Sequence, residues 1–229
     1  MRDADILKAE SPHQFSENEK LGVYRSIYER RDIRREFLPT PVPNDILLKL
    51  LDAAHHAGSV GFMQPWNFIV IQKESLKRQV KEIFERENCR ASENYGEERK
   101  GKYLSMKLEG ILEAPVNLCV TCDGLRNGPH VLGRNTIPET DLFSTCCAVQ
   151  NLWLAARSEG IGVGWVSILD NRDLKTLLKI PGHIRPVAYL CLGYVTRFPE
   201  KPMLEETGWG KRIPLEELVF WDEWSQKCP

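Results

Sequence analysis

Apolar residues recur at helical spacing in the first part of the chain that has a regular pattern. Four of them follow the three- to four-residue repeat of one helix face: Val23, Tyr24, Ile27 and Tyr28. Ser16 followed by Glu19 three residues later has the pattern of a capping box, which satisfies free backbone N–H groups at a helix start. These signals predict an amphipathic helix that begins after Ser16.

Four further apolar runs predict strands, and the periodic segments between them predict helices. The strands are expected at residues 66–72, 116–123, 161–168 and 183–195. Helices are expected at 44–54, 75–87 and 140–158, with a short one from Asn171 and a last one that opens at Lys211. Four strands among five or six helices, in mixed order, indicate an α+β or α/β domain with both sheet faces covered.

The third predicted strand contains the alternating glycines Gly162 and Gly164, just after Gly160. This is not a dinucleotide-binding fingerprint, because such a fingerprint follows a strand and opens a helix, whereas these glycines lie between a helix and a strand. Glycine inside a strand marks a place where another group approaches the backbone closely. The pattern therefore predicts a close neighbour along this strand.

Composition and charge narrow the class of protein. The 229 residues are 42% hydrophobic and 28% charged, which suits one globular domain with a full core. A net charge of −1 and a pI near 6.5 argue against a general nucleic-acid binder. No apolar stretch approaches the ~18–20 residues of a membrane span, and residues 1–5 lack the apolar core of a signal peptide. We therefore expect a cytoplasmic protein without a nucleic-acid or membrane partner.

The seven cysteines do not have the spacing of a metal or disulfide site. Cys119 and Cys122 form a C-x-x-C pattern inside a predicted strand, where residues three apart point to opposite faces. Cys146 and Cys147 have no second pair to complete a ligand set in their predicted helix. We expect reduced core thiols and no metal site.

Segment 30–37, with the sequence RRDIRREF, holds four arginines and one aspartate within six residues. If the preceding helix continues, Arg30 and Arg34 share a face, and their guanidinium groups could hold one dianion such as a phosphate. Asp32 would then point elsewhere and be free for another role. A solvated basic helix end explains the same string equally well.

Residues 89–107 are the polar outlier of the chain, rich in charged side chains with Tyr95 and Tyr103 among them. A long polar excursion in a compact domain is often a lid or a binding loop. A plain helix that faces solvent is at least as consistent with the composition, so both interpretations stay open.

Taken together, the motifs resemble those of the nitroreductase-like flavoprotein family. The blocks are the arginine-rich segment RRDIR, Gln64-Pro65-Trp66-x-Phe68 before the first strand, a Gly-rich strand after a long helix, and Leu192-Gly193-Tyr194 followed by Lys211-Arg212-Ile213-Pro214. They run from about residue 24 to residue 220, nearly the whole chain. The resemblance implies a single α+β domain over residues 1–229, with a mixed central sheet covered by helices. It also implies an intertwined homodimer that binds FMN at the subunit interface.

Three departures from the common pattern of that family resemble its flavin-cleaving branch. Asp32 stands where a small hydroxyl residue is common, Phe62 where an asparagine is common, and Ser167 where an acidic residue is frequent. That branch consumes reduced FMN and O2, and forms 5,6-dimethylbenzimidazole, the lower ligand of cobalamin, with a four-carbon sugar phosphate. The resemblance therefore implies that a separate NAD(P)H-dependent flavin reductase supplies reduced FMN.

The resemblance also implies roles for individual residues. Arg30, Arg34 and Arg212 would hold the phosphate, and Arg31 would either join them or pair with Glu36. Asp32 would accept a proton, and Ser167 would donate a hydrogen bond or relay a proton. The other expected contacts to the flavin are Ile33, Gly61, Phe62, Met63, Trp165, Val166 and Ile168. A lid over residues 89–107 would exclude bulk water.

Simpler interpretations remain beside these roles. Asp32 could be an ion-pair partner that spaces the arginines, and Ser167 could be a core serine bonded to backbone. The whole chain could be an NAD(P)H-dependent FMN reductase or nitroreductase with a persistent FMN cofactor. It could also be a non-enzymatic module that binds a flavin or another phosphorylated ligand.

Overall fold

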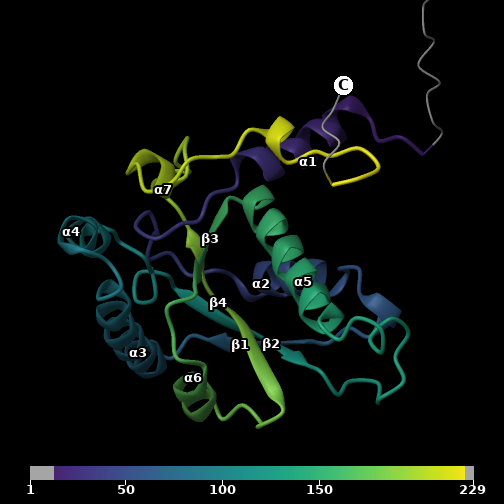
Figure 1. Ribbon diagram of the computed structural model, residues 1–229, viewed down its shortest axis with the longest axis horizontal. Coiled ribbons are helices and arrows are strands. Elements are labelled where there is room, and N and C mark those ends of the chain that lie inside the picture. The colour runs from purple at the N-terminus through teal and green to yellow at the C-terminus, as the bar shows by residue number, and fades with distance from the viewer. Residues whose placement is uncertain (1–12, 225–229) are drawn as a thin grey trace, which may run out of the picture.

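The computed structural model describes residues 13–224, and the prediction about residues 1–5 lies outside them. The chain folds around one four-stranded sheet with helices on both faces (Figure 1). The strands are β1 Trp66–Ile71, β2 Val116–Asp123, β3 Ile161–Val166 and β4 Ile184–Tyr194. The main helices are α1 Glu17–Glu29, α2 Asn44–His55, α3 Glu74–Ser92, α4 Glu97–Ser105, α5 Thr140–Ser158 and α6 Asn171–Leu178.

The strand order is β1-β2-β4-β3, and all three ladders are antiparallel. The sheet was expected to be mixed, and this detail differs, because the parallel component among the described residues is the single bridge between Asp32 and Val163. Central strands β2 and β4 are buried almost throughout, which explains their continuous apolar runs. The α+β prediction is confirmed.

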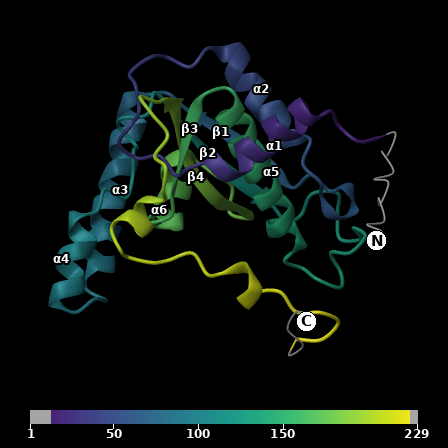
Figure 2. The same ribbon diagram turned by 90° about the horizontal axis from the view of Figure 1, so that it is seen from above.

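Two apolar clusters divide the core between the two faces of the sheet. One face packs against α2 and α5, with Leu50, Leu152 and Leu190 in its cluster. The opposite face packs against α3 and α6, with Phe84, Leu174 and Tyr189 in the other cluster. The molecule is thus a helix–sheet–helix sandwich, and Figure 2 shows α3 and α5 on opposite sides of the strands.

The cysteine prediction is correct for the C-x-x-C pair. Cys119 belongs to the cluster beneath α3, whereas the Cys122 thiol interacts with Thr145 of α5 on the other face. Both are free thiols, and burial raises the pKa of Cys119 to about 12. The two sulfurs therefore cannot form one site.

The polar segment 89–107 is helical over most of its length. α3 extends to Ser92, five residues beyond the predicted end, and α4 begins at Glu97 after a short turn. The two helices form a hairpin at one edge of the molecule (Figure 1). None of the helices within residues 13–224 has the length and apolar character needed to span a bilayer.

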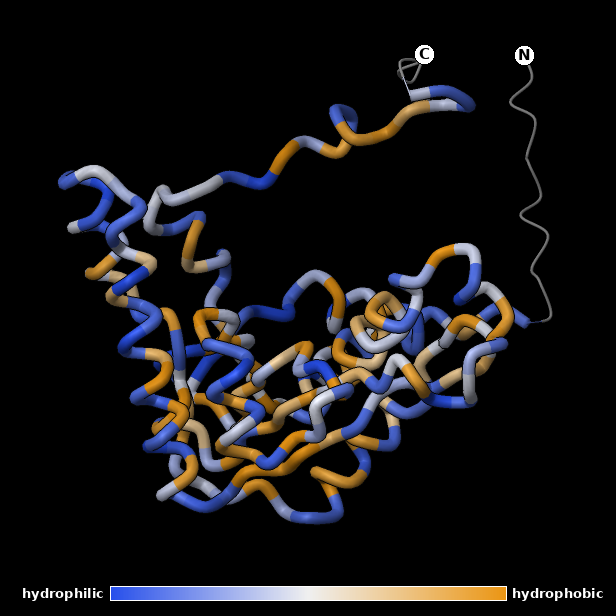
Figure 3. Tube along the Cα trace, turned by 60° about the horizontal axis from the view of Figure 1, so that its bottom comes forward, coloured by the Kyte–Doolittle hydropathy of each residue, from blue (hydrophilic) through white to orange (hydrophobic). Residues whose placement is uncertain are grey.

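The predicted C-terminal helix is wrong. Only a 3-10 turn forms at Leu215–Glu217, after the short helix α7 at Met203–Glu206. We call residues 199–224 the C-terminal arm; its end stands away from the rest of the chain (Figure 3). A longer helix is absent because most apolar side chains after residue 212 stay exposed and find no partner surface within residues 13–224. Those exposed by more than half are Ile213, Leu215, Leu218, Trp221 and Trp224.

Candidate active site

Segment 30–37 extends along the outer edge of the sheet beside β3. The Ile33 N–H donates to the Val163 carbonyl at 3.0 Å, and bridges join Asp32 to Val163 and Phe37 to Val195. α1 ends at Glu29, and Arg30 is already extended, with ψ at 136°. The capping box at Ser16 is confirmed, but the helix does not continue into the arginine segment.

The glycines of β3 make room for this segment. A Cβ atom on Gly164 would lie 2.0 Å from the Ile33 carbonyl oxygen, and one on Gly162 would lie 2.9 Å from a side-chain carbon of Ile33. Real Cβ atoms do not approach so closely, so a side chain at Gly164 would displace segment 30–37 from the sheet. The close neighbour predicted from these glycines is therefore Ile33.

Asp32 lies half-buried at this edge, with its side chain 29% exposed. Its Oδ1 accepts the Trp165 N–H at 2.8 Å, and its Oδ2 pairs with the Arg34 guanidinium. Burial raises the pKa of Asp32, while Arg34, the Trp165 N–H and Arg30 act to lower it. A carboxyl held at a raised pKa among cations can exchange a proton more readily than a free aspartate.

The helix face that was expected to bring Arg30 and Arg34 together does not form, because α1 ends at Glu29, and a joint phosphate clamp stays a prediction. The Arg30 guanidinium lies over the Trp153 ring, 4.8 Å from its centroid. Arg34 instead turns to Asp32 and to the Met203 sulfur, which its Nη1 atom contacts at 3.7 Å. The expectation that Asp32 points away from both arginines is wrong, because its carboxylate pairs with Arg34 and the charge of Arg30 also acts on it.

Arg31 neither joins a clamp nor pairs with Glu36. It donates to the carbonyls of Tyr28, Arg30 and Glu200, so it ties the end of α1 to the start of the C-terminal arm. Burial lowers the pKa of Arg30, Asp32 acts to raise it, and Arg31 and Arg212 lower it further, so Arg212 of the same arm lies close enough for its charge to act on Arg30.

Ser167 lies just past the end of β3, which the sequence had extended to residue 168. It is exposed, and no hydrogen bond of its hydroxyl is found in residues 13–224, so it is not a backbone-bonded core serine. Together with Trp165 and Val166 it lines a pocket of about 130 Å³. Ser167 follows by two residues the N–H group that holds Asp32, but Asp32 lines a different pocket, so the chain alone does not bring the two side chains into one cavity.

The other predicted flavin contacts lie elsewhere. Residues 61–64 form a tight turn, in which Gly61, Phe62 and Gln64 have φ values of 58°, 52° and 47°. Phe62 is 80% exposed, whereas Met63 is completely buried. The Met63 side chain therefore cannot contact a ligand, although its backbone belongs to the turn.

The 61–64 turn and segment 30–37 pack at different points along α5. The N–H of Val60 donates to the Ser144 hydroxyl, near the start of α5, and the Trp153 indole donates to the Arg31 carbonyl. Nine residues of helix separate these contacts, or roughly 13 Å along the axis. Within one chain the predicted flavin contacts thus fall into two separate groups.

A pocket of about 280 Å³ opens beside Asp32, between segment 30–37, the end of α4 and the C-terminal arm. Residues that the sequence analysis does not single out complete the pocket: Arg197, just before the arm, and Lys201, Met203 and Glu206 on the arm. Three cations that line the pocket, Arg35, Arg197 and Lys201, have no ion pair within the described part of the chain. The charged residues that follow β4 were the one sequence signal for this part of the pocket. No neighbouring motif connected them to Asp32.

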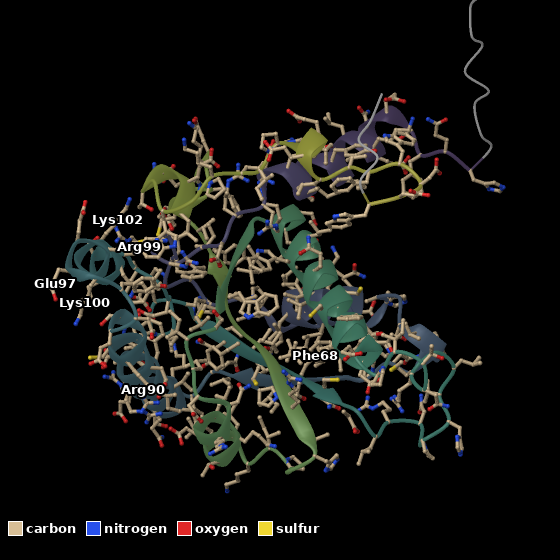
Figure 4. All side chains as sticks on the ribbon, viewed as in Figure 1. Phe68, Arg90, Glu97, Arg99, Lys100 and Lys102 are labelled. Atoms are coloured by element: carbon tan, nitrogen blue, oxygen red, sulfur yellow. The ribbon has the colours of Figure 1, made fainter. Side chains whose placement is uncertain are left out.

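α4 is fastened to the C-terminal arm at this pocket. Trp209 packs against Tyr95 and Tyr103 with ring centroids 5.3 and 6.1 Å away. The Arg99 guanidinium lies 4.6 Å from the Trp209 ring centroid, and the Lys102 ammonium donates to the Gly208 carbonyl at 3.0 Å. Figure 4 shows Arg99 and Lys102 on the side of α4 nearest α7. The polar segment is therefore neither a free loop nor a plain surface helix.

The donors around Asp32 suit a phosphorylated, planar ligand such as FMN. The Nε atoms of Arg31 and Arg34 are buried without a hydrogen-bond partner, and Arg30 and Arg212 place two more positive charges nearby. Guanidinium groups with free donors are suited to phosphate and to carbonyl oxygens. Their arrangement is compatible with a flavin nucleotide at the edge of β3.

Comparison with known proteins assigns the fold and the family. The family model described as the nitroreductase family matches residues 27–194. The chain belongs to the nitroreductase family. The structure of a BluB-like flavoprotein from Clostridium difficile has a TM-score of 0.67 and 19% identity, and the match covers 88% of this chain and 99% of that one. Oxidised iodotyrosine deiodinase, solved with FMN and 3-iodo-L-tyrosine, has a TM-score of 0.66 and 26% identity, over 79% and 94% of the two chains.

Within the nitroreductase family, curated relatives agree with the branch indicated by Asp32 and Ser167. A Rhodospirillum rubrum protein named 5,6-dimethylbenzimidazole synthase is 40% identical over 185 residues, 81% of this chain and 87% of that protein. One from Rhodobacter capsulatus with the same name is 35% identical over 187 residues, 82% and 90% of the two chains. The predicted resemblance to a flavoprotein enzyme of this family is confirmed, as is the similarity to proteins named 5,6-dimethylbenzimidazole synthase.

Proposed function

We propose that the chain catalyses the O2-dependent fragmentation of reduced FMN to 5,6-dimethylbenzimidazole and a four-carbon sugar phosphate. The observation that carries this proposal is the environment of Asp32, a half-buried carboxyl with a raised pKa, close to Arg30 and Arg34 and fixed by the Trp165 N–H. Similarity to the two synthases supports it. Reduced FMN and O2 are both substrates, and bound reduced flavin supplies the electrons for the reaction with O2.

The charges on both sides of Asp32 suggest how the substrate is oriented. Arg30 and Arg212 would hold the phosphate, because the two guanidinium groups lie near each other and neither forms an ion pair within residues 13–224. Arg34 would move its free donors to the ligand while still flanking Asp32. The ribityl chain would then lie along the backbone of segment 30–37 beside the end of β3, because the Ile33 side chain is completely buried and cannot contact it.

Asp32 would accept a proton from the ribityl or ring carbons, and its raised pKa favours this transfer near neutral pH. The Trp165 N–H fixes one carboxylate oxygen, so the other oxygen becomes available when Arg34 turns to the ligand. Ser167, which is exposed beside Trp165 and Val166, would donate a hydrogen bond or relay a proton to the flavin ring.

A second copy of the chain would complete the site. α1 buries none of its side chains, and its apolar residues remain exposed together with those of the C-terminal arm. An intertwined homodimer would cover both surfaces and would bring the partner's 61–64 turn to the edge where Asp32 lies. The Phe62 ring and the backbone of Gly61 and Met63 would then flank the isoalloxazine ring.

Segment 89–107 would act as a lid that excludes bulk water from the reduced flavin. Two observations support this role: the segment contacts Trp209 and Gly208 of the C-terminal arm, and its residues Ser105 and Met106 line the pocket beside Asp32. A separate NAD(P)H-dependent flavin reductase would supply reduced FMN.

The test is incubation of the purified protein with chemically reduced FMN in air, with mass spectrometry of the products. We expect 5,6-dimethylbenzimidazole and a four-carbon sugar phosphate in equal amounts, and neither product when the protein is left out. Return of intact FMN, with NADH oxidation by the protein alone, would identify a flavin reductase or nitroreductase instead. Tight FMN binding without any turnover would leave a binding module.

A further inference from the structure

Residues 61–64 adopt a backbone conformation that is costly for the side chains they carry. Phe62 and Gln64 have left-handed φ values of 52° and 47°, which non-glycine residues seldom adopt. Gly61 has the same handedness, and a Cβ atom there would lie 2.6 Å from the Leu132 carbonyl oxygen. Such strain persists only when the surrounding structure over-determines it, and it concentrates at functional sites.

Arg126 provides much of the hold on this turn. Its Nη1 atom donates to the Gln64 carbonyl at 3.0 Å and to the Trp66 carbonyl at 3.2 Å, and its Nη2 atom bonds the Asn67 side chain. One guanidinium thus spans the end of the turn and the start of β1. Asn127 adds a bond from its amide to the Met63 carbonyl at 3.2 Å.

Arg134 in turn fixes the loop that carries Arg126. This arginine is only 8% exposed, and its Nε atom donates to the Asp141 carboxylate of α5 at 2.8 Å. Its Nη1 atom donates to the carbonyls of Arg126 and Gly128 at 3.0 and 2.8 Å, and its Nη2 atom contacts the Met63 sulfur at 3.5 Å. Arg134 therefore links α5, the loop and the turn.

Together these contacts hold the Phe62 side chain in a fixed position at the tip of the turn. The residue after it, Met63, is locked in the core, whereas the Phe62 ring is 80% exposed at the tip of the turn. An exposed aromatic ring on strained backbone gains nothing for the isolated chain. Its rigid presentation is useful only to something that the ring contacts outside its own chain.

We infer that Arg126 and Arg134 are positioning residues, which hold the 61–64 turn so that Phe62 completes the Asp32 site of a second copy of the chain. This inference rests on the proposed function, and it assigns a task to two arginines that do not themselves reach Asp32. Roughly 13 Å of α5 separates the contact points of the turn and of segment 30–37, which argues against a shared site within one chain.

The first test uses Arg126→Ala, because Arg126 is less buried than Arg134 and its one ion pair, with Asp123 at 3.8 Å, is long. Product formation should fall by about 100-fold, since an error of about 1 Å in position can have that effect on rate. Thermal unfolding and circular dichroism should stay near wild type. Arg126→Lys should recover part of the rate, because an ammonium group can still donate to one of the two carbonyls. Arg172→Ala is the matched control, an exposed arginine on α6, and should behave as wild type.

The second test asks whether Arg126 acts through Phe62. Phe62→Ala should lower product formation by a similar factor, and the double variant Phe62→Ala/Arg126→Ala should be no slower than either single variant. Effects that multiply in the double variant would show that Arg126 has a separate role, and would overturn the inference.

The decisive test uses mixed dimers of two inactive variants, Asp32→Asn and Arg126→Ala, purified through two different affinity tags. If the turn serves the partner's site, each mixed dimer holds one site with both lesions and one site with neither. It should therefore form product at about half the wild-type rate, although each parent variant is nearly inactive. No recovery in mixed dimers would mean that Arg126 acts within its own chain, and would overturn the inference. Failure of the wild-type protein to form any benzimidazole would instead contradict the proposed function.

Discussion

Segment 30–37 and the 61–64 turn are held in place by different kinds of contact. Segment 30–37 joins the sheet through main-chain hydrogen bonds, such as that from Ile33 to Val163, and its Ile33 carbonyl fills the space that a side chain at Gly164 would need. The 61–64 turn has a left-handed backbone and depends on side chains that come from a loop some sixty residues later, above all on Arg126.

This difference separates the two kinds of functional position in the molecule. Asp32 has an ordinary extended backbone, so the groups around its carboxylate determine its chemistry, and no unusual backbone conformation is involved. Phe62 stands on strained backbone, so its geometry is the feature that requires support. Side-chain substitutions should therefore change chemistry at segment 30–37 and position at the turn.

The largest effect is expected for Asp32→Asn, which tests whether the carboxylate at segment 30–37 does chemistry. Asparagine keeps the size of aspartate and can accept the Trp165 N–H, but it cannot act as a base. Product should fall by about 10²–10⁴-fold, the usual contribution of a positioned acid–base group, while reduced FMN still binds. Benzimidazole measured by mass spectrometry, beside binding measured without oxygen, decides this. Nearly unchanged product would reduce Asp32 to a spacer between arginines.

Stability provides an independent check on the same variant. Burial raises the pKa of Asp32 above its usual value, so the folded state retains the proton more readily than the unfolded chain. The carboxyl therefore lowers the free energy of unfolding as pH rises through the folded-state pKa. Asp32→Asn should unfold at a higher temperature than wild type at pH 7, and the difference should vanish below about pH 4, the ordinary pKa range. A less stable variant at pH 7 would contradict the direction of the shift.

Arg34→Ala should have the next largest effect, and it separates charge from position. Loss of the Arg34 partner leaves Asp32 with a higher pKa, so the acidic limb of the pH–rate profile should move to higher pH. At neutral pH product formation should fall by roughly 10- to 100-fold, since a hydrogen bond to a charged group contributes about 1.5–3 kcal/mol. A riboflavin control, which lacks the phosphate, tells whether Arg34 also binds that group. An unshifted profile would mean that Arg34 does not tune Asp32.

Gly164→Ala tests the sheet edge itself. The new methyl group would meet the Ile33 carbonyl, so we expect a loss of about 1–3 kcal/mol in the free energy of unfolding, the usual range for overpacking. In a chain of this size that corresponds to roughly 3–10 °C in Tm by thermal denaturation. Gly182→Ala is the control, because no atom lies within 4 Å of its added Cβ. Equal Tm values for the two variants would show that segment 30–37 does not need the space.

The smallest effect is expected for Trp209→Ala, which loosens the hold of the C-terminal arm on α4. Amide exchange in Glu97–Ser105 should become several-fold faster, because the variant removes the ring packed on Tyr95, Tyr103 and Arg99. Reduced flavin should slow exchange there in wild type if the segment closes over the ligand. Equal exchange with and without reduced flavin would leave α4 without a lid function.

Much of the fold could be predicted from the sequence, because local patterns determine it. The predicted ranges 116–123 and 140–158 match β2 and α5, whose apolar runs end where burial ends. The C-terminal helix could not be excluded, since Leu215 and Leu218 have helical spacing although no surface of the same chain covers them. The spacing of apolar residues indicates which side chains need to be buried, but not whether the same chain or another one buries them.

The site was less predictable, because its contacts connect distant parts of the chain. The Asp32 carboxylate and the Trp165 N–H are 133 positions apart, and neither residue carries a signal of the other. The spacing of Arg30 and Arg34 suggested a helix face, but the backbone leaves the helix at Arg30. Arg126 escaped notice altogether, because it stands in a loop without a regular pattern.

The two glycines of β3 also limit how the protein can change over evolution. The space above Gly162 is filled by side-chain carbons of Ile33 and Val195, so smaller residues at those positions could permit a larger one at 162. The space above Gly164 is filled by the Ile33 carbonyl, which every amino acid possesses. Position 162 can therefore covary with its neighbours, whereas position 164 has no compensating substitution. Among descendants that keep segment 30–37 on this strand, residue 164 should remain glycine while residues 33, 162 and 195 drift together.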